Sequence, residues 1–358
     1  MQNRLIDLIL GLLAISLLPP CPVLPVFTEV VTPPTLASIT PDRQAREGDT
    51  NSSLIRPNCL HLEPASTIPS TLPNDEYLDK QWALNKLQAV EAWQITSGGE
   101  DILIAVLDTG IDQTHEDLMD KVAASVNFTD SPTASDLHGH GTHIAGIIAA
   151  TANNGIGIVG LAPNSRLLNV KVADRSGMVE PSKIAEGIMW AVDNGAKVIN
   201  MSFTLSEPAQ AVEDAVDYAW SKGIVVVAAS GNYVGDRPTY PACYCNCLAV
   251  AATDASDCVG SWSSRDDSVH VAAPGVNIYS TLPDNCYGYK SGTSMAAAYV
   301  AGVAGLLFSV VCDANDSGLL NDEVRDAIEN NCDEIGILGI GGGCTGECKD
   351  DFVVQDEP

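Results

Sequence analysis

Three separated segments of the chain carry side chains suited to nucleophilic catalysis. Asp108 closes an apolar run, His140 lies in a Gly-rich stretch, and Ser294 opens a run of small residues. A serine hydroxyl is a weak nucleophile until a base takes its proton, and an imidazole can do so near neutral pH. A carboxylate bonded to that imidazole fixes its tautomer. These residue types therefore predict acyl transfer by an activated serine.

Each segment also has a simpler interpretation on its own. An Asp before a Thr-Gly pair can cap a turn, and a Ser at the start of a helix is often its N-cap. Histidines at positions 138, 140 and 143 suggest a metal site, but the glycines between them favour a flexible backbone over a rigid set of ligands. Only the three segments together favour catalysis.

Taken in order, the segments Asp-Thr-Gly, His-Gly-Thr-His and Gly-Thr-Ser-Met-Ala resemble those of the subtilisin-like proteases, the subtilases, and most closely their thermitase-like branch. The resemblance covers about residues 73–308. It implies a serine endopeptidase in which Ser294 is the nucleophile, His140 the general base and Asp108 its partner. His140 is chosen because it is the first His of the His-Gly-Thr-His match.

The same resemblance implies an oxyanion-stabilising pair. Asn232, in Ser230-Gly231-Asn232, matches the side-chain donor of the family, and the backbone N–H of Ser294 would be the second donor. A helix N-terminus favours negative charge at that point. A turn Asn after Gly is the simpler alternative.

Substrate-binding residues are expected from the resemblance as well. The segment Ser202-Phe203-Thr204 would pair with extended substrate backbone, and Gly177 would lie on the opposite edge. No charged residue is expected in the pocket that receives the substrate side chain before the cleaved bond. The resemblance therefore predicts a preference for a neutral or apolar substrate side chain at that position. Its expected residues are Ala229, Gly231 and Thr239. A cis peptide is expected at Tyr240-Pro241.

Structural calcium is the cofactor that the resemblance implies. The loop at 152–158 is open and Gly-bearing, and calcium prefers oxygen ligands that include backbone carbonyls. A plain loop between elements is the alternative. The expected ligands are the carboxylates of Asp75 and Asp117, the side chain of Asn154 and the carbonyls of Ala152, Ile156 and Ile158.

Two departures from the family pattern leave other functions open. Ala297-Ala298-Tyr299 stands where the family has Thr-Pro-His, and Phe203-Thr204 stands where it has Leu-Gly. A lost Pro in the first turn could shift Ser294, and the larger pair could narrow the substrate site. The alternatives are a catalytically impaired binding module and an enzyme that passes its acyl group to an amine.

The elements that must position these residues alternate along the chain. Apolar runs at 102–107, 167–172, 198–201 and 224–229 predict buried strands, and 248–252 and 269–272 follow. Helices are expected at 140–151, 181–194, 208–222, 293–311 and 321–330, the last capped by Asn321. Buried strands joined by helices indicate an α/β fold with a mostly parallel sheet between two helical layers, a three-layer αβα architecture.

Composition narrows the classes of partner. The 358 residues include 46 acidic and 18 basic side chains, a formal net charge of −28, which opposes binding to nucleic acid. Of the 11 cysteines, 9 lie in the last third of the chain, and export favours disulfides there, with a metal cluster as the alternative.

The chain ends suggest an exported and processed protein. Residues 1–21 resemble a signal peptide, with an N-terminal membrane anchor as the alternative, and 22–73 is a Pro- and Ser-rich pro-segment or linker. Residues 74–332 would form the peptidase domain, and 333–358 a Cys- and Gly-rich acidic tail. We expect a secreted monomer acting on polypeptides.

Overall fold

The computed structural model describes residues 72–233, 239–264 and 269–333. The signal peptide or anchor, nearly all of the pro-segment and the acidic tail lie outside these ranges and stay predictions. None of the helices in the described ranges is long and apolar enough to cross a membrane.

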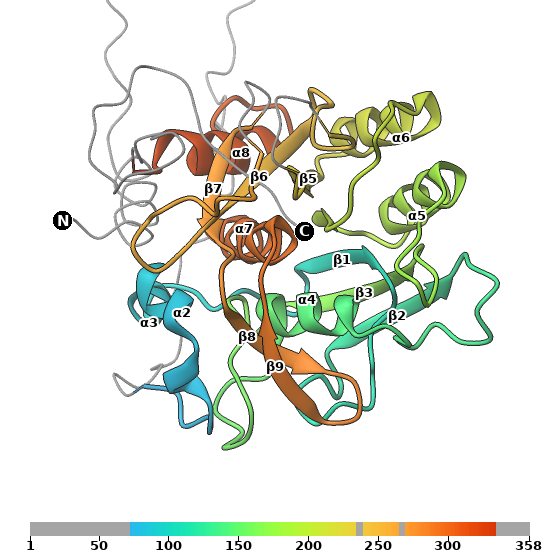
Figure 1. Ribbon diagram of the computed structural model, residues 1–358. Helices are drawn as coiled ribbons and strands as arrows, with labels where there is room; N and C mark the ends of the chain where they lie inside the picture. The colour runs from blue at the N-terminus through green and yellow to red at the C-terminus, as the bar shows by residue number, and fades with distance from the viewer. Residues whose placement is uncertain (1–71, 234–238, 265–268, 334–358) are drawn as a thin grey trace, which may run out of the picture.

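A parallel sheet forms the centre of the molecule (Figure 1). Its order within the described residues is β2-β3-β1-β4-β5-β6-β7, and each neighbouring pair runs parallel. The strands are β1 (Leu103–Asp108), β2 (Val122–Asn127), β3 (Arg166–Lys171), β4 (Val198–Met201), β5 (Val225–Ala229), β6 (Cys247–Thr253) and β7 (Val271–Pro274).

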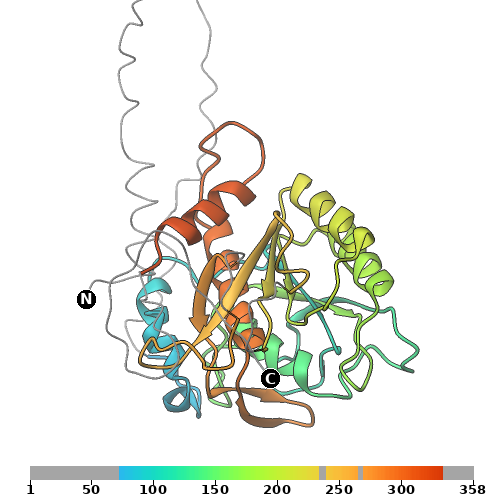
Figure 2. The same cartoon turned by 45° about the horizontal axis from the view of Figure 1, so that its top comes forward.

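Helices cover both faces of this sheet. The helical elements are η1 (Leu78–Lys80), α2 (Trp82–Lys86), α3 (Ala89–Ala92), α4 (His140–Ala149), α5 (Pro181–Asp193), α6 (Gln210–Ser221), α7 (Thr293–Phe308) and α8 (Asn321–Asn330). Alternate residues of β1 point to opposite sides: Ile104 and Val106 pack with α4 and α7, whereas Ala105 and Leu107 pack with α5 and α6. Figure 2 shows α5 and α6 on one side of the sheet and α7 on the other. The predicted three-layer fold is confirmed.

Helix α7 runs through the larger core cluster, and all of its residues are buried. Small side chains, including Ala297 and Ala298, let it approach the sheet closely, and Tyr299 is buried among them. The helix begins at Thr293 without the family's Pro. Ser294 therefore lies in the first turn of a helix that core packing holds in place.

Several elements were not predicted from the sequence. Strand β2 is a half-buried edge strand of small residues, and β8 (Ile278–Leu282) pairs with β9 (Cys286–Lys290) as an antiparallel hairpin beside α4. The hairpin is tied to α4 because the hydroxyls of Ser280 and Thr281 donate to helix carbonyls. Asn321 is not the N-cap of α8: it is the first helical residue, and its side chain donates to the carbonyl of Trp220.

The described ranges contain both a disulfide-bonded cysteine and free cysteine thiols. Cys258 is disulfide-bonded, whereas Cys245, Cys247 and Cys286 carry free thiols. Burial raises the pKa of the Cys247 thiol, which disfavours its thiolate.

No group of three or more His, Cys, Asp or Glu side chains in the described part of the chain is arranged to hold a metal. The expected cis peptide at Tyr240-Pro241 is present.

Candidate active site

The carboxyl end of β1 and the start of α4 bring Asp108 and His140 together. Asp108 is the last residue of its strand and 2% exposed, and His140 is the first residue of its helix. The close approach depends on Gly141, because a Cβ there would lie 2.2 Å from the Gly110 carbonyl oxygen and 3.0 Å from Asp108 Oδ1. Gly139, at the N-cap, has a φ of +94°, which favours glycine.

The two side chains share a charge-assisted hydrogen bond. His140 Nδ1 lies 2.8 Å from Asp108 Oδ1 and 2.9 Å from Oδ2. Burial alone lowers the pKa of His140, but the Asp108 carboxylate overcomes this effect and raises it, with a smaller contribution from Asp136 and an opposing one from Lys290. The carboxylate thus stabilises the protonated imidazole.

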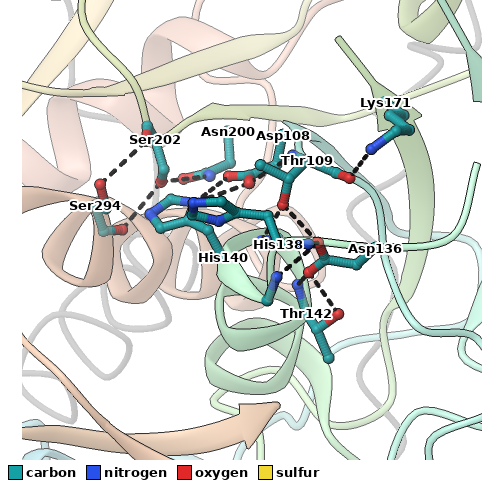
Figure 3. Close-up of polar contacts among 12 residues, drawn as sticks. Asp108, Thr109, Asp136, His138, His140, Thr142, Lys171, Asn200, Ser202 and Ser294 are labelled. Atoms are coloured by element: carbon teal, nitrogen blue, oxygen red, sulfur yellow. Dashed lines mark hydrogen bonds and ion pairs between the residues drawn. The ribbon is translucent and has the colours of Figure 1, made fainter. Parts of the chain in front are cut away.

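Ser294 approaches this pair from α7, and Figure 3 places the His140 ring between Asp108 and Ser294. The Ser294 hydroxyl donates to the Ser202 carbonyl at 3.0 Å, not to His140. In return, the Ser202 hydroxyl donates to the Ser294 carbonyl at 3.0 Å and accepts from Asn200 Nδ2 at 2.8 Å. These reciprocal bonds fix the carboxyl end of β4 against the first turn of α7.

The expected oxyanion donors border one common space. Asn232 Oδ1 accepts from the N–H of Thr293 at 3.1 Å and from its hydroxyl at 3.0 Å, which leaves the amide nitrogen free to donate elsewhere. A Cβ built on Gly292 would lie 3.7 Å from the Ser294 nitrogen and 3.8 Å from Asn232 Nδ2. The two nitrogen atoms therefore lie near one common point.

The expected substrate-binding residues come from three separate segments of the chain. Ser202, Phe203 and Thr204 follow β4, and the Phe203 ring packs against the α5–α6 core cluster. Gly177 lies in a turn with a φ of +80°, and a Cβ on it would be 3.5 Å from His138 Nε2. The remaining three, Ala229, Gly231 and Thr239, are buried, and the Thr239 hydroxyl donates to the Ser230 carbonyl.

The six expected calcium ligands converge on one loop. Asp75 accepts from the N–H of Asn153 at 2.9 Å, and Asp117 accepts from the N–H of Ile158 at 2.7 Å. Burial raises the pKa of both carboxyls. Neither has a lysine or arginine partner within the described ranges, and a calcium ion would compensate their charge.

Other features of the loop also suit a cation bound by oxygen atoms. Within the described ranges, the carbonyl oxygens of Ala152, Ile156 and Ile158 accept no hydrogen bond. A Cβ on Gly157 would lie 1.9 Å from Asp117 Oδ2, so the residue must be glycine. Asn154 differs from the expectation, because its amide nitrogen donates to Asp117 Oδ1 at 2.7 Å and its oxygen accepts from the N–H of Ile156. Ligation through that oxygen would require the opposite orientation of the amide.

Three residues that support the site were missed in the sequence. Asp136 bonds the start of α4, Thr293 orients Asn232, and Lys171 donates to the carbonyl of Thr109. An Asp shortly before a helix start is a capping signal and could have identified Asp136. Lys171 has no comparable signal, because a lysine at the end of a strand is ordinarily solvent-exposed and nothing local indicates its burial.

Comparison with known proteins shows the family to which the chain belongs. A profile described as the subtilase family matches residues 99–343. The chain is 46% identical over 269 residues to thermitase from Thermoactinomyces vulgaris, which covers 75% of this chain and 94% of that protein. It is 45% identical over 269 residues to a thermophilic serine proteinase from Bacillus sp. (strain AK1), covering 75% and 65%. Identity to subtilisin Savinase from Lederbergia lenta is 40% over 261 residues, covering 73% and 94%. The chain therefore belongs to the subtilase family and is a serine-type endopeptidase.

Proposed function

We propose that Asp108, His140 and Ser294 are the catalytic triad of this endopeptidase. The observation that carries the proposal is the contact of His140 Nδ1 with both Asp108 carboxylate oxygens, at 2.8 and 2.9 Å, beside Ser294. This bond holds the proton on Nδ1, so that Nε2 is the basic nitrogen.

The reaction begins when the Ser294 hydroxyl leaves the Ser202 carbonyl and donates to His140 Nε2. Catalytic hydrogen bonds are often long in the free enzyme and tighten in the substrate complex. Ser294 Oγ attacks the substrate carbonyl carbon as His140 takes the hydroxyl proton, and the carbonyl oxygen becomes an oxyanion. His140 then gives the proton to the leaving amine, and water hydrolyses the ester that remains on Ser294.

Asn232 Nδ2 and the Ser294 N–H are the oxyanion donors in this proposal. Preorganised donors cost no reorganisation when charge develops, and their position at the start of α7 adds the field of a helix N-terminus. The two bonds from Thr293 to Asn232 Oδ1 support this role because they fix which end of the amide is free.

The substrates are polypeptides, bound as an extended strand along Ser202-Phe203-Thr204 and the Gly177 turn. No charged side chain is present among Ala229, Gly231 and Thr239, which supports a neutral or apolar side chain before the cleaved bond. The acidic surface charge suits a secreted protein and opposes nucleic acid. We further propose that the mature enzyme acts as a monomer.

Calcium is proposed as a structural cofactor of the 152–158 loop. Asp75, Asp117, Asn154 and the carbonyls of Ala152, Ile156 and Ile158 would hold it. The ion would neutralise the two buried carboxylates and connect the segment before η1, which carries Asp75, to the loop after α4 and to the segment after β1, which carries Asp117.

The test uses the secreted, mature protein and a Ser294→Ala variant. We expect cleavage of a peptide library and labelling of Ser294 by a fluorophosphonate, both absent from the variant, with equal melting temperatures. Unchanged turnover in Ser294→Ala would refute the triad. A folded native protein that is neither labelled nor active would support the impaired binding module. Product analysis with an added amine separates hydrolysis from acyl transfer.

A further inference from the structure

Two charged side chains that the proposed reaction does not use are buried behind Asp108 and His140. Asp136 lies just before α4 and is 4% exposed, and Lys171 ends β3 and is 0% exposed. A buried charge is costly unless it is paired or hydrogen-bonded. Their contacts show what compensates that cost.

Asp136 supplies the cap that α4 otherwise lacks. Its Oδ1 accepts from the N–H groups of His138 and Gly139, both at 2.8 Å, and its Oδ2 accepts from the N–H and hydroxyl of Thr142 at 2.9 and 2.8 Å. Burial by itself raises the pKa of Asp136, but these bonds lower it below its usual value. The helix that begins with His140 is therefore held by a carboxylate.

Lys171 contacts the same unit from the neighbouring strand. It is the partner of Asp108 in the β1–β3 register, and its Nζ donates to the Thr109 carbonyl. The Thr109 hydroxyl donates to Asp136 at 2.9 Å and accepts from the N–H of Gly141 at 3.0 Å. Thr109 thus connects the lysine, the capping carboxylate and the start of α4, as Figure 3 shows for Lys171, Thr109 and Asp136.

The charges around His140 come from several elements. Asp108 and Asp136 favour its protonated form, and Lys290 of β9 opposes it. His138 lies with its ring centroid 6.4 Å away. His143 of α4 is buried, which lowers its pKa to about 3 and keeps it neutral. Burial also lowers the pKa of Lys171, while Asp136, Asp108 and Asp174 favour its charge.

We propose that Asp136 and Lys171, joined through Thr109, are positioning residues with opposite electrostatic effects on the His140 imidazolium. The proposal rests on the triad assignment. Asp136 stabilises the imidazolium and fixes the helix that carries it. Lys171 offsets part of the negative charge of the two carboxylates and so limits how far they favour the imidazolium.

The test is the pH dependence of kcat/KM, because its acid limb reports the pKa of the His140 imidazole in the free enzyme. Lys171→Met should move this limb to higher pH, and Asp136→Asn should move it to lower pH. A shift of one pH unit changes kcat/KM on the limb by about tenfold. Asp136→Asn should also lower the plateau by about tenfold, less than the ~10²-fold loss for a 1 Å misplacement.

Two matched variants separate charge from structure. Lys197→Met removes a charge from an exposed lysine that precedes β4, so its acid limb should stay in place. Thr109→Val removes two hydrogen bonds but no charge, so kcat should fall while the limb stays in place. If Lys171→Met does not fold, Lys171→Gln, which keeps a donor for the Thr109 carbonyl, carries the same test.

The His140 titration can also be followed by NMR in the Ser294→Ala background, without turnover or self-digestion. Opposite shifts in the Asp136 and Lys171 variants support the proposal. Unchanged titration in both folded variants, or shifts in the same direction, would overturn it. A native enzyme without an acid limb, or an active Ser294→Ala variant, would instead refute the triad.

Discussion

Replacing Asn232 by alanine should lower kcat much more than it changes KM. The amide oxygen of Asn232 is held by the N–H and hydroxyl of Thr293, at 3.1 and 3.0 Å, so the amide nitrogen is the donor that remains. This nitrogen and the Ser294 nitrogen lie 3.8 and 3.7 Å from the same point above Gly292. A donor aimed at an oxyanion acts in the transition state and contributes little to ground-state binding.

The expected size of the effect has two separable parts. Loss of one oxyanion donor costs about 10²–10³ in kcat, or ~2.7–4 kcal/mol of transition-state stabilisation. The same variant leaves the Thr293 N–H and hydroxyl without their acceptor, which costs ~1 kcal/mol of stability for each bond. A loss of ~2 kcal/mol lowers the melting temperature of a domain of this size by about 4–8 °C. Thr293→Val loses the hydroxyl bond to Asn232 and also the acceptor of the Gly231 N–H, at 3.4 Å, so its melting temperature should fall by a similar amount while Asn232 keeps its amide nitrogen as a donor.

The assay measures kcat and KM on one peptide substrate, with thermal unfolding followed in parallel. Asn194→Ala is the matched control, because it removes an exposed amide at the C-cap of α5. Its kcat and KM should equal the native values. A fall in kcat of less than about tenfold in folded Asn232→Ala would refute the assignment, as would a higher KM with unchanged kcat.

Three further predictions concern the loop and the cap of α4. If calcium is first present at about 100 times its Kd, its chelation should lower the free energy of unfolding by ~2.7 kcal/mol and the melting temperature by about 5–11 °C. Asp117→Asn should abolish this response, whereas the exposed Asp193→Asn should keep it. An unchanged melting temperature after chelation of the native protein would refute the site. Gly157→Ala should lower the free energy of unfolding, measured in urea, more than Gly155→Ala does. Both glycines have positive φ, but only a Cβ on Gly157 would lie 1.9 Å from Asp117 Oδ2. Equal decreases would contradict this reasoning. Since the folded-state pKa of Asp136 is lowered, its charge stabilises the fold fully above the unfolded pKa of about 3.9, and this contribution is lost as pH falls through the folded value. Asp136→Asn should therefore be less stable than the native protein at neutral pH and approach it in acid, and a pH-independent difference would count against the charge.

Local pattern predicted much of the fold because the buried strands are long apolar runs. The predicted strand at 198–201 has the observed bounds, and helix α4 starts at His140 as expected. The pattern failed where elements are stabilised by contacts distant in sequence. Of the hydrophobic residues in β8 and β9 only Ile278 is buried, and their hairpin is fixed by hydrogen bonds to α4 between residues more than one hundred positions apart.

The residues of the site also fall into two groups, those predicted from local sequence and those placed by contacts distant in sequence. Residue types and the resemblance of the motifs to those of the subtilases predicted catalytic roles for Asp108, His140, Ser294 and Asn232, because acyl transfer needs a nucleophile, a base, its partner and an oxyanion donor. The motifs did not identify the groups that hold them. Thr293 lies 61 positions from the amide that it orients, and Lys171 lies 62 positions from the carbonyl that it contacts.

By itself, the sequence determined the chemistry available to this protein and the alternation of strands and helices, since both follow from residue type and local periodicity. Tertiary structure alone decided three features: the Ser202 carbonyl as the acceptor of the Ser294 hydroxyl, the orientation of the Asn232 amide and the burial of Lys171 behind Asp108. Those outcomes depend on hydrogen bonds between strand ends and helix starts, which exist only after the sheet has brought distant segments together.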